Sequence, residues 1–293
     1  MSIKSTRNSP SRELSVLIPS AFRSFFSGLG VLVPLFFPLI AGVAIVWVAG
    51  EDCYVNAEST RSAIFMIVCA NLWCGLFNSI SVVTKERGYI RREYMAGVMR
   101  IRSYTRSRAL VQLILCLFQS LMFCLIFVAI PEVYGNSIPE QGVLFSSDDL
   151  GEHSVLVEYY ITTFLIVLSA DALGFFLSCA VRPGQSASSM TPYVLMLQIL
   201  LCGMLFDLSG TAAALSQGMI CRWGNEALGT ISNINELPLR ISEEFPMIPH
   251  EPEDAFLYTK DHLIKTWLIL GAFSILPFFA GNLMLHRVKH DVR

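Results

Sequence analysis

The chain has 293 residues, of which 54% are hydrophobic and only 15% are charged, and its formal net charge is −2. Soluble domains usually carry about a quarter charged residues, so this composition excludes an ordinary soluble protein. Several stretches without Lys, Arg, Asp or Glu reach the roughly 20 apolar residues that a helix needs to cross a bilayer. We therefore predict an all-α integral membrane protein that has the lipid bilayer as its surroundings.

Residues 1–27 are predicted to form a cytoplasmic and interfacial lead. Its first thirteen residues are polar and basic. From Leu14 to Phe25, apolar residues recur at helical spacing, which predicts an amphipathic helix in the plane of the lipid headgroups. Pro19 lies inside this pattern, so we expect the helix to begin or to kink there.

A membrane domain is predicted over residues 28–285, with six transmembrane helices. The fifth is short for a full crossing, and the mildly apolar segment 208–219 after it is a candidate re-entrant or interfacial piece. The long outer segment 207–262, rich in Pro near 238–252, is expected to form a small outer domain or a pair of short helices. Residues 286–293 form a predicted cytoplasmic tail. The expected spans are 28–50, 62–84, 109–130, 159–181, 191–206 and 263–285.

The charges of the loops predict the orientation of these spans. Residues 85–108 hold eight Lys or Arg against two Glu, whereas residues 131–158 hold six acidic residues and no Lys or Arg. The segment 207–262 is also acidic. Because cytoplasmic loops carry an excess of Lys and Arg, we expect both termini and loop 85–108 in the cytoplasm of a multi-pass cell-membrane protein.

Motifs of common enzymes do not occur in this sequence. It contains no HExxH, no GxSxG, no zinc-type Cys/His cluster and no GxxxxGK[ST] phosphate loop. The chain is thus predicted not to be an enzyme and to hold no metal or cofactor of its own. Six of the eight cysteines fall in apolar spans, while Cys53 and Cys221 lie in predicted outer loops, where their pairing stays open.

The loop between the second and third spans carries the most information about function. It reads Lys85-Glu-Arg-Gly-Tyr-Ile-Arg-Arg-Glu-Tyr-Met-Ala-Gly97 and continues to Ser103-Tyr104. By composition it is a charged helix, and two interpretations are open. One is an ordinary basic juxtamembrane loop that orients the chain and contacts anionic lipid. The other depends on the order of its residues.

That order resembles the coupling-helix region of type-2 permeases of ABC transporters, including the G subfamily and similar bacterial members. The family pattern is a Lys-Glu-Arg, then an Arg-Glu, a Gly and a Ser-Tyr that opens the third span. The resemblance covers roughly residues 60–285 and departs from bacterial members that carry an ATPase on the same chain, so we expect a separate ATPase subunit or a split version. The matching segments are 85–87, 92–93, 97, 103–104, 173–178, 182–192, 203–206, 223–229 and 233–238.

This resemblance implies a transport subunit with several partners. An ABC ATPase subunit would hold the ATP and Mg, and a second permease protomer would complete a homo- or heterodimeric exporter that works by alternating access. The path would lie between the second and fifth spans of facing protomers. The residues implied in contacts with the ATPase, or within the helical bundle, are Glu86, Arg87, Arg91, Arg92 and Glu93, while Gly97 and Tyr104 would shape the return into the membrane. No nucleic-acid partner is expected.

Polar residues inside the spans are a second set of candidates. An ionisable side chain such as Asp171 is costly in a bilayer and is expected to face protein or water. The polar side chains either line a translocation path or form hydrogen bonds between helices. In the second case, Asn71, Gln112 or Gln119 would be the expected partner of Asp171. The set is Asn71, Asn78, Gln112, Gln119, Asp171 and Gln198.

Two further functions stay open on the sequence alone. One is a proton-linked secondary carrier that uses Asp171, although the two halves show no convincing repeat of the kind common in such carriers. The other is a membrane scaffold that transports nothing, in which case the loop 85–108 would bind no ATPase.

Overall fold

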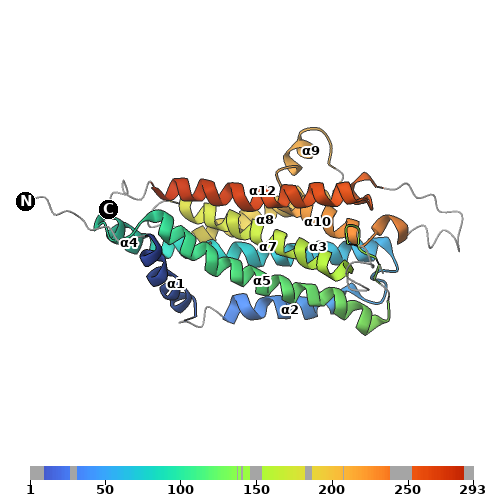
Figure 1. Ribbon diagram of the computed structural model, residues 1–293. Helices are drawn as coiled ribbons and strands as arrows, with labels where there is room; N and C mark the ends of the chain where they lie inside the picture. Colours follow the sequence, from blue (N-terminus) through green and yellow to red (C-terminus); the bar gives the residue numbers. More distant parts are fainter. Residues whose placement is uncertain are drawn as a thin grey trace, which may run out of the picture.

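The computed structural model describes residues 10–26, 32–136, 138–139, 141–145, 154–181, 187–206, 208–237 and 253–286, and all secondary structure within these ranges is helical. Figure 1 shows an elongated bundle whose long helices run along a common axis. The predicted all-α architecture is confirmed at this level. The outermost lead and tail and the Pro-rich stretch 238–252 lie outside the described residues.

Four helices are long and apolar enough to cross a membrane, and they match four predicted spans. They are α3 (Ala57–Ser79), α5 (Ile101–Tyr134), α7 (Ser154–Ala180) and α12 (Lys260–Leu285). The candidate membrane segment Ala57–Met95 includes the whole predicted span 62–84, with α3 ending at Ser79 and a charged helix following it. Helix α5 includes the whole predicted span 109–130 and begins earlier, at Ile101, because polar residues continue the helix beyond its apolar part.

The helices at the predicted first and fifth spans are shorter than these four. Helix α2 (Leu32–Ala49) covers the described part of the first span. Helix α8 (Thr191–Leu200) has 10 residues, so it rises about 15 Å, about half of the roughly 30 Å hydrocarbon core. The chain is not helical from residue 201 to residue 206, where the fifth span was expected to continue. Six crossings therefore stay a prediction.

Helix α7 is the centre of the bundle and packs against α3, α5, α10 and α12. Its contact with α3 is close because both helices place glycine there. A Cβ atom on Gly75 would lie 2.4 Å from the Val167 carbonyl oxygen, and one on Gly174 would lie 2.7 Å from the Leu76 carbonyl oxygen. Small residues of this kind let membrane helices approach backbone to backbone, where dispersion contacts hold them together.

An amphipathic helix, α1 (Pro10–Phe26), covers the end of the bundle where α5 begins. It begins at Pro10 and contains Pro19 inside the helix, so the expectation that the helix starts at Pro19 was wrong. In Figure 1, α1 crosses the bundle axis steeply near α4 (Val82–Met95). Its buried Glu13 accepts a hydrogen bond of 2.7 Å from the Ser103 hydroxyl and lies 3.7 Å from Arg100. This buried carboxylate fastens α1 to the first turn of α5.

The opposite end of the bundle holds the described part of the predicted outer segment. It contains two short helices, α9 (Gly210–Ser216) and α10 (Ile220–Ile231), as the sequence suggested. Helix α9 stands off the side of the bundle in Figure 1, whereas α10 packs against α3, α7 and α12. The loop at 143–145 is held at this end by Glu158, whose carboxylate accepts three backbone N–H groups at 2.6 to 2.9 Å.

Candidate functional site

The predicted coupling residues lie on and around α4, at the end of the bundle that also holds α1. After α3 ends, two residues lead into α4, and the chain leaves α4 through Gly97, whose φ is +72°. Glycine adopts this left-handed conformation without strain and commonly follows the end of a helix. Three residues later Arg100 caps α5. The two turns place α4 between the membrane-length helices α3 and α5.

One face of α4 is fastened to α7 through the ends of both helices. The first turn of α4 donates two backbone N–H groups, from Val83 and Thr84, to the Ser178 hydroxyl at 3.1 and 3.3 Å. In return, the Arg87 guanidinium donates to the carbonyl oxygens of Cys179 at 3.4 Å and Val181 at 2.8 Å. Free N–H groups at a helix start and free carbonyls at a helix end need such partners, so the two ends complete each other.

The same helix is fastened to α5 by a charged cluster. The Tyr104 hydroxyl donates a hydrogen bond of 2.7 Å to one oxygen of Glu86, and Arg108 forms an ion pair with the other oxygen. The Arg108 guanidinium also lies 5.8 Å from the centre of the Tyr104 ring. Because the side chains of Glu86 and Arg108 are only 22% and 12% exposed, water screens this pair little. Thus Glu86, Arg87 and Tyr104 are all used inside the protomer.

The other face of α4 carries side chains that the protomer leaves exposed. Arg92 is 75% exposed and has only the adjacent Glu93 near its Nε, at 3.7 Å. Met95 is 65% exposed and Tyr89 is 43% exposed, while Arg91 and Glu93 are partly buried. Helix α4 is therefore held firmly by one face and presents a mixed cationic and apolar surface on the other.

Three of the predicted polar candidates form one network that joins α2, α3 and α5. The Asn78 and Gln119 side-chain amides exchange hydrogen bonds of 2.7 and 3.1 Å. Gln112 donates to the Asn78 carbonyl oxygen at 2.9 Å, and Gln119 donates to the Pro34 carbonyl oxygen at the same distance. Pro38 has no backbone N–H, so it leaves the Pro34 carbonyl oxygen without its usual partner in the helix. Gln119 supplies a hydrogen bond to that oxygen instead.

The other three polar candidates lie apart from this network. Asp171 accepts a hydrogen bond of 2.5 Å from the Ser79 hydroxyl, so its expected partnership with Asn71, Gln112 or Gln119 was wrong. Asn71 donates to a carbonyl of its own helix at 2.7 Å, and Gln198 accepts from the Cys221 backbone N–H at 3.1 Å. All six candidates are at most 7% exposed.

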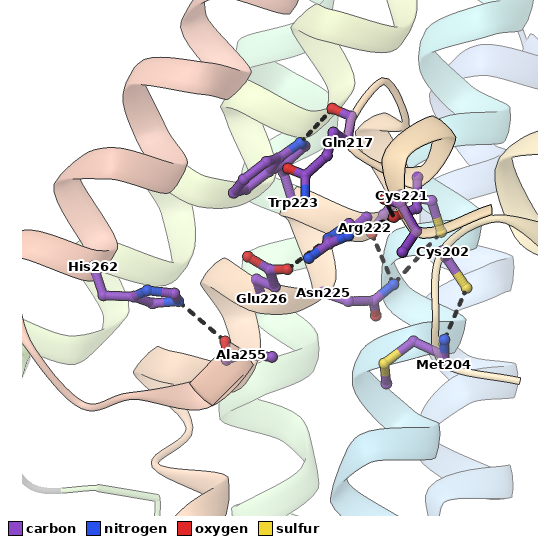
Figure 2. A network of polar contacts seen from close by, with 12 residues as sticks. Cys202, Met204, Gln217, Cys221, Arg222, Trp223, Asn225, Glu226, Ala255 and His262 are labelled. Carbon is purple, nitrogen blue, oxygen red and sulfur yellow. Dashed lines mark hydrogen bonds and ion pairs between the residues drawn. The ribbon is translucent and has the colours of Figure 1, made fainter. Parts of the chain in front are cut away.

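Polar contacts also order the base of the outer segment (Figure 2). Arg222 pairs with Glu226 at 2.8 Å, and the Trp223 indole N–H donates to the Gln217 carbonyl oxygen at 2.8 Å. Cys221 and Cys53 are both free and buried, and burial raises the pKa of the Cys53 thiol to about 11. The structure thus contains no disulfide between these two residues.

Sequence reasoning did not find several residues that complete these contacts. Arg108, Ser79 and Glu13 were missed because their partners are far away in the chain: 22 residues for Arg108, 92 for Ser79 and 90 for Glu13. The sequence signal for Glu13 was its position as a single acidic residue directly before the apolar residues of the amphipathic helix. The apolar face of α3 was missed as well, where Trp73 and Phe77 stack with ring centres 5.3 Å apart and stay 41% and 48% exposed.

Comparison with known proteins gives one match that covers most of the chain. The family model for ABC-2 type transporters matches residues 13–228, which extends from α1 into α10 and includes all of α4. No curated protein sequence matches the chain significantly.

Proposed function

This chain belongs to the ABC-2 type transporter family and is a permease subunit of an ABC transporter; from that premise we propose that it works as one half of an ATP-driven exporter. Family membership also implies association with an ABC ATPase subunit and a membrane location. The finer proposals are a homo- or heterodimer of permeases, six crossings with both termini in the cytoplasm, and a place in the plasma or inner membrane. In this proposal ATP and Mg bind to the ATPase subunit.

The observation that carries the proposal is the two-sided construction of α4. Its exposed side, with Tyr89, Arg92 and Met95, offers a cation and apolar contacts to a partner in the cytoplasm. Its other side is fastened through Arg87 to α7 and through Glu86 to α5. A displacement of α4 by a partner would therefore move two membrane-length helices with it.

This construction suggests how ATP binding would be transmitted. Closure of two ATPase subunits would draw the α4 helices of two protomers together. Because α4 is bonded to the ends of α5 and α7, the bundle would rotate as a body rather than bend at α4. The positive φ of Gly97 sets the angle at which α4 meets α5, so this glycine is proposed to fix the geometry of the transmission. Such a device changes access from one side of the membrane to the other.

We place the walls of the translocation path on α3 and α8, which pack against each other. Both helices leave large apolar side chains exposed on a single protomer, among them Trp73, Phe77, Tyr193 and Met196. The five buried amides and the carboxylate candidate are better suited to bracing these walls from behind, because each side chain already forms a hydrogen bond within the protomer. Contributions of roughly 1 kcal/mol are typical of such bonds between membrane helices.

Co-purification tests the proposal most simply. The tagged full-length chain, extracted from its native membrane in mild detergent, is expected to retain a subunit with a P-loop ATPase sequence. Arg92→Glu should weaken that association because it reverses a charge on the exposed side of α4. The matched control is Lys260→Glu, which reverses an exposed charge at the other end of the bundle and should leave the association intact.

The two alternatives predict different outcomes of the same preparation. A scaffold protein would retain no ATPase in either the wild type or the control. A proton-linked carrier would transport without ATP and would lose its pH dependence in the Asp171→Asn variant. Retention of an ATPase, together with ATP-dependent transport in Asp171→Asn, excludes both.

A further inference from the structure

One exposed side of α5 begins with two arginines and continues with leucines. Arg102 and Arg106 are exposed, and they are four residues apart, so they lie one above the other on the helix. At the same helical spacing, the exposed face continues through apolar side chains between 38% and 48% exposed, namely Leu110, Leu113, Leu117 and Leu121. We infer that Arg102 and Arg106 bind the headgroup phosphate of an anionic phospholipid in the leaflet next to α4, whose acyl chains lie along these leucines.

The charges around α5 leave these two arginines available for a ligand. Arg100 lies 3.7 Å from Glu13 and Arg108 pairs with Glu86, so two of the four arginines in residues 100–108 already face a carboxylate. Among the described residues, neither Arg102 nor Arg106 forms an ion pair. Residues 101–131 also contain no Asp or Glu that could neutralise them. Guanidinium groups bind phosphate oxygens in bidentate geometry, which makes a phosphate the fitting occupant.

The position of the two arginines along α5 agrees with the depth of lipid headgroups. The hydrogen bond between Glu13 and Ser103 places α1 beside the first turn of α5. Figure 1 shows that α1 crosses the bundle axis steeply at this end, as a helix that lies along the membrane surface does. Arg106 precedes Leu110 by one helical turn, about 6 Å along the axis. A phosphate at the arginines would thus have its acyl chains at the level of the first leucines.

The same arrangement distinguishes a lipid from the other candidate occupants. A cytoplasmic ATPase subunit is expected on the exposed face of α4, around Arg92, and it has no means of following a stripe of leucines into the bilayer. Free inorganic phosphate would use the arginines but leave the leucines without a partner. A phospholipid satisfies both parts of the stripe. The inference depends on α5 crossing a membrane and is independent of the proposed export and of the ATPase.

Native mass spectrometry of the purified full-length chain, with phosphatidylglycerol or phosphatidylcholine titrated in, tests this inference. Each cation near an anionic headgroup strengthens binding about fivefold, so Arg102→Gln/Arg106→Gln should weaken phosphatidylglycerol binding by about thirtyfold and leave phosphatidylcholine binding unchanged. Arg102→Lys/Arg106→Lys keeps the charge but loses the paired donors of the guanidinium, so its affinity for phosphatidylglycerol should lie between those of the wild type and the Gln variant. The matched control, Lys85→Gln/Arg92→Gln, removes two exposed cations from α4 at the same end of the bundle and should keep full phosphatidylglycerol binding.

Several results would overturn the inference. Unchanged phosphatidylglycerol binding in Arg102→Gln/Arg106→Gln would show that the arginines hold no lipid. An equal loss in Lys85→Gln/Arg92→Gln would show an effect of total charge. Displacement of phosphatidylglycerol by millimolar inorganic phosphate would assign the site to a free anion. Loss of a co-purified ATPase from Arg102→Gln/Arg106→Gln, with lipid binding intact, would assign the stripe to the ATPase. A thermal transition equal to wild type, measured in phosphatidylcholine nanodiscs, shows that each variant is folded.

Discussion

Breaking the contact between Glu86 and Arg108 should loosen α4 from α5 and destabilise the bundle. Removing one partner of a fully buried ion pair costs about 3–5 kcal/mol, while fully exposed pairs contribute less than about 1 kcal/mol. With exposed fractions of 22% and 12%, this pair lies between the two limits. In Glu86→Gln the amide oxygen still accepts the Tyr104 hydroxyl, so we expect a loss of about 2 kcal/mol from the free energy of unfolding.

A double-mutant cycle isolates the pair from other effects of the substitutions. Glu86→Gln, Arg108→Gln and the double variant would be unfolded reversibly by sodium dodecyl sulfate in mixed micelles. We expect the double variant to lose about 1–2 kcal/mol less than the sum of the single losses, as contacting residues do. Arg92→Gln, on the exposed side of the same helix, is the control and should change stability by less than about 0.5 kcal/mol. Single losses that add to within about 0.3 kcal/mol would refute the contact.

Three further predictions concern helix packing, the turn after α4 and a buried thiol. Gly75→Val should lower the free energy of unfolding by at least about 2 kcal/mol, because its Cβ would lie 2.4 Å from the Val167 carbonyl oxygen. In the control, Gly88→Ala, the added Cβ meets no atom within 4 Å, so this variant should be tolerated. Equal stabilities of the two variants would contradict the close approach of α3 and α7. Gly97→Ala should cost about 1 kcal/mol in the free energy of unfolding, because an L-residue is strained at φ +72°, and an unchanged stability would contradict this turn. Burial raises the pKa of the Cys53 thiol to about 11, and only the thiolate reacts with maleimide. Cys53 should therefore react more slowly than an exposed thiol at pH 7, and its reaction rate should still rise above pH 9. A reaction rate that reaches a plateau below pH 9 would contradict the burial of Cys53.

The sequence was sufficient to predict the main helices and the location of the charged helix between two of them. Long apolar runs identified α3, α5, α7 and α12, because a bilayer requires such runs wherever a helix crosses it. Hydropathy does not detect the polar turns at the ends of such helices, so the sequence did not predict that α5 begins at Ile101. The fifth span was already short by this measure, and the structure ends α8 at Leu200.

The contacts of the candidate site were harder to predict because they join distant parts of the chain. The order of residues around Glu86, Arg87 and Gly97 identified α4 as a special segment. It did not indicate that Arg87 reaches the end of α7, since that contact spans 94 residues. The partner of Asp171 was also misassigned, because helical spacing places residues on a face without stating which face meets which neighbour. Ser79 takes that place in the structure.

We propose that the exposed face of α4 binds an ABC ATPase subunit. A photo-reactive amino acid placed at Met95, which is 65% exposed on α4, tests this directly in intact membranes. The same probe at Val16, which is 66% exposed on α1, is the matched control. We expect an ultraviolet-dependent adduct between the Met95 probe and a subunit with a P-loop sequence, and no such adduct from the Val16 probe. A Met95 probe that crosslinks only to lipid, or to no protein, would contradict it.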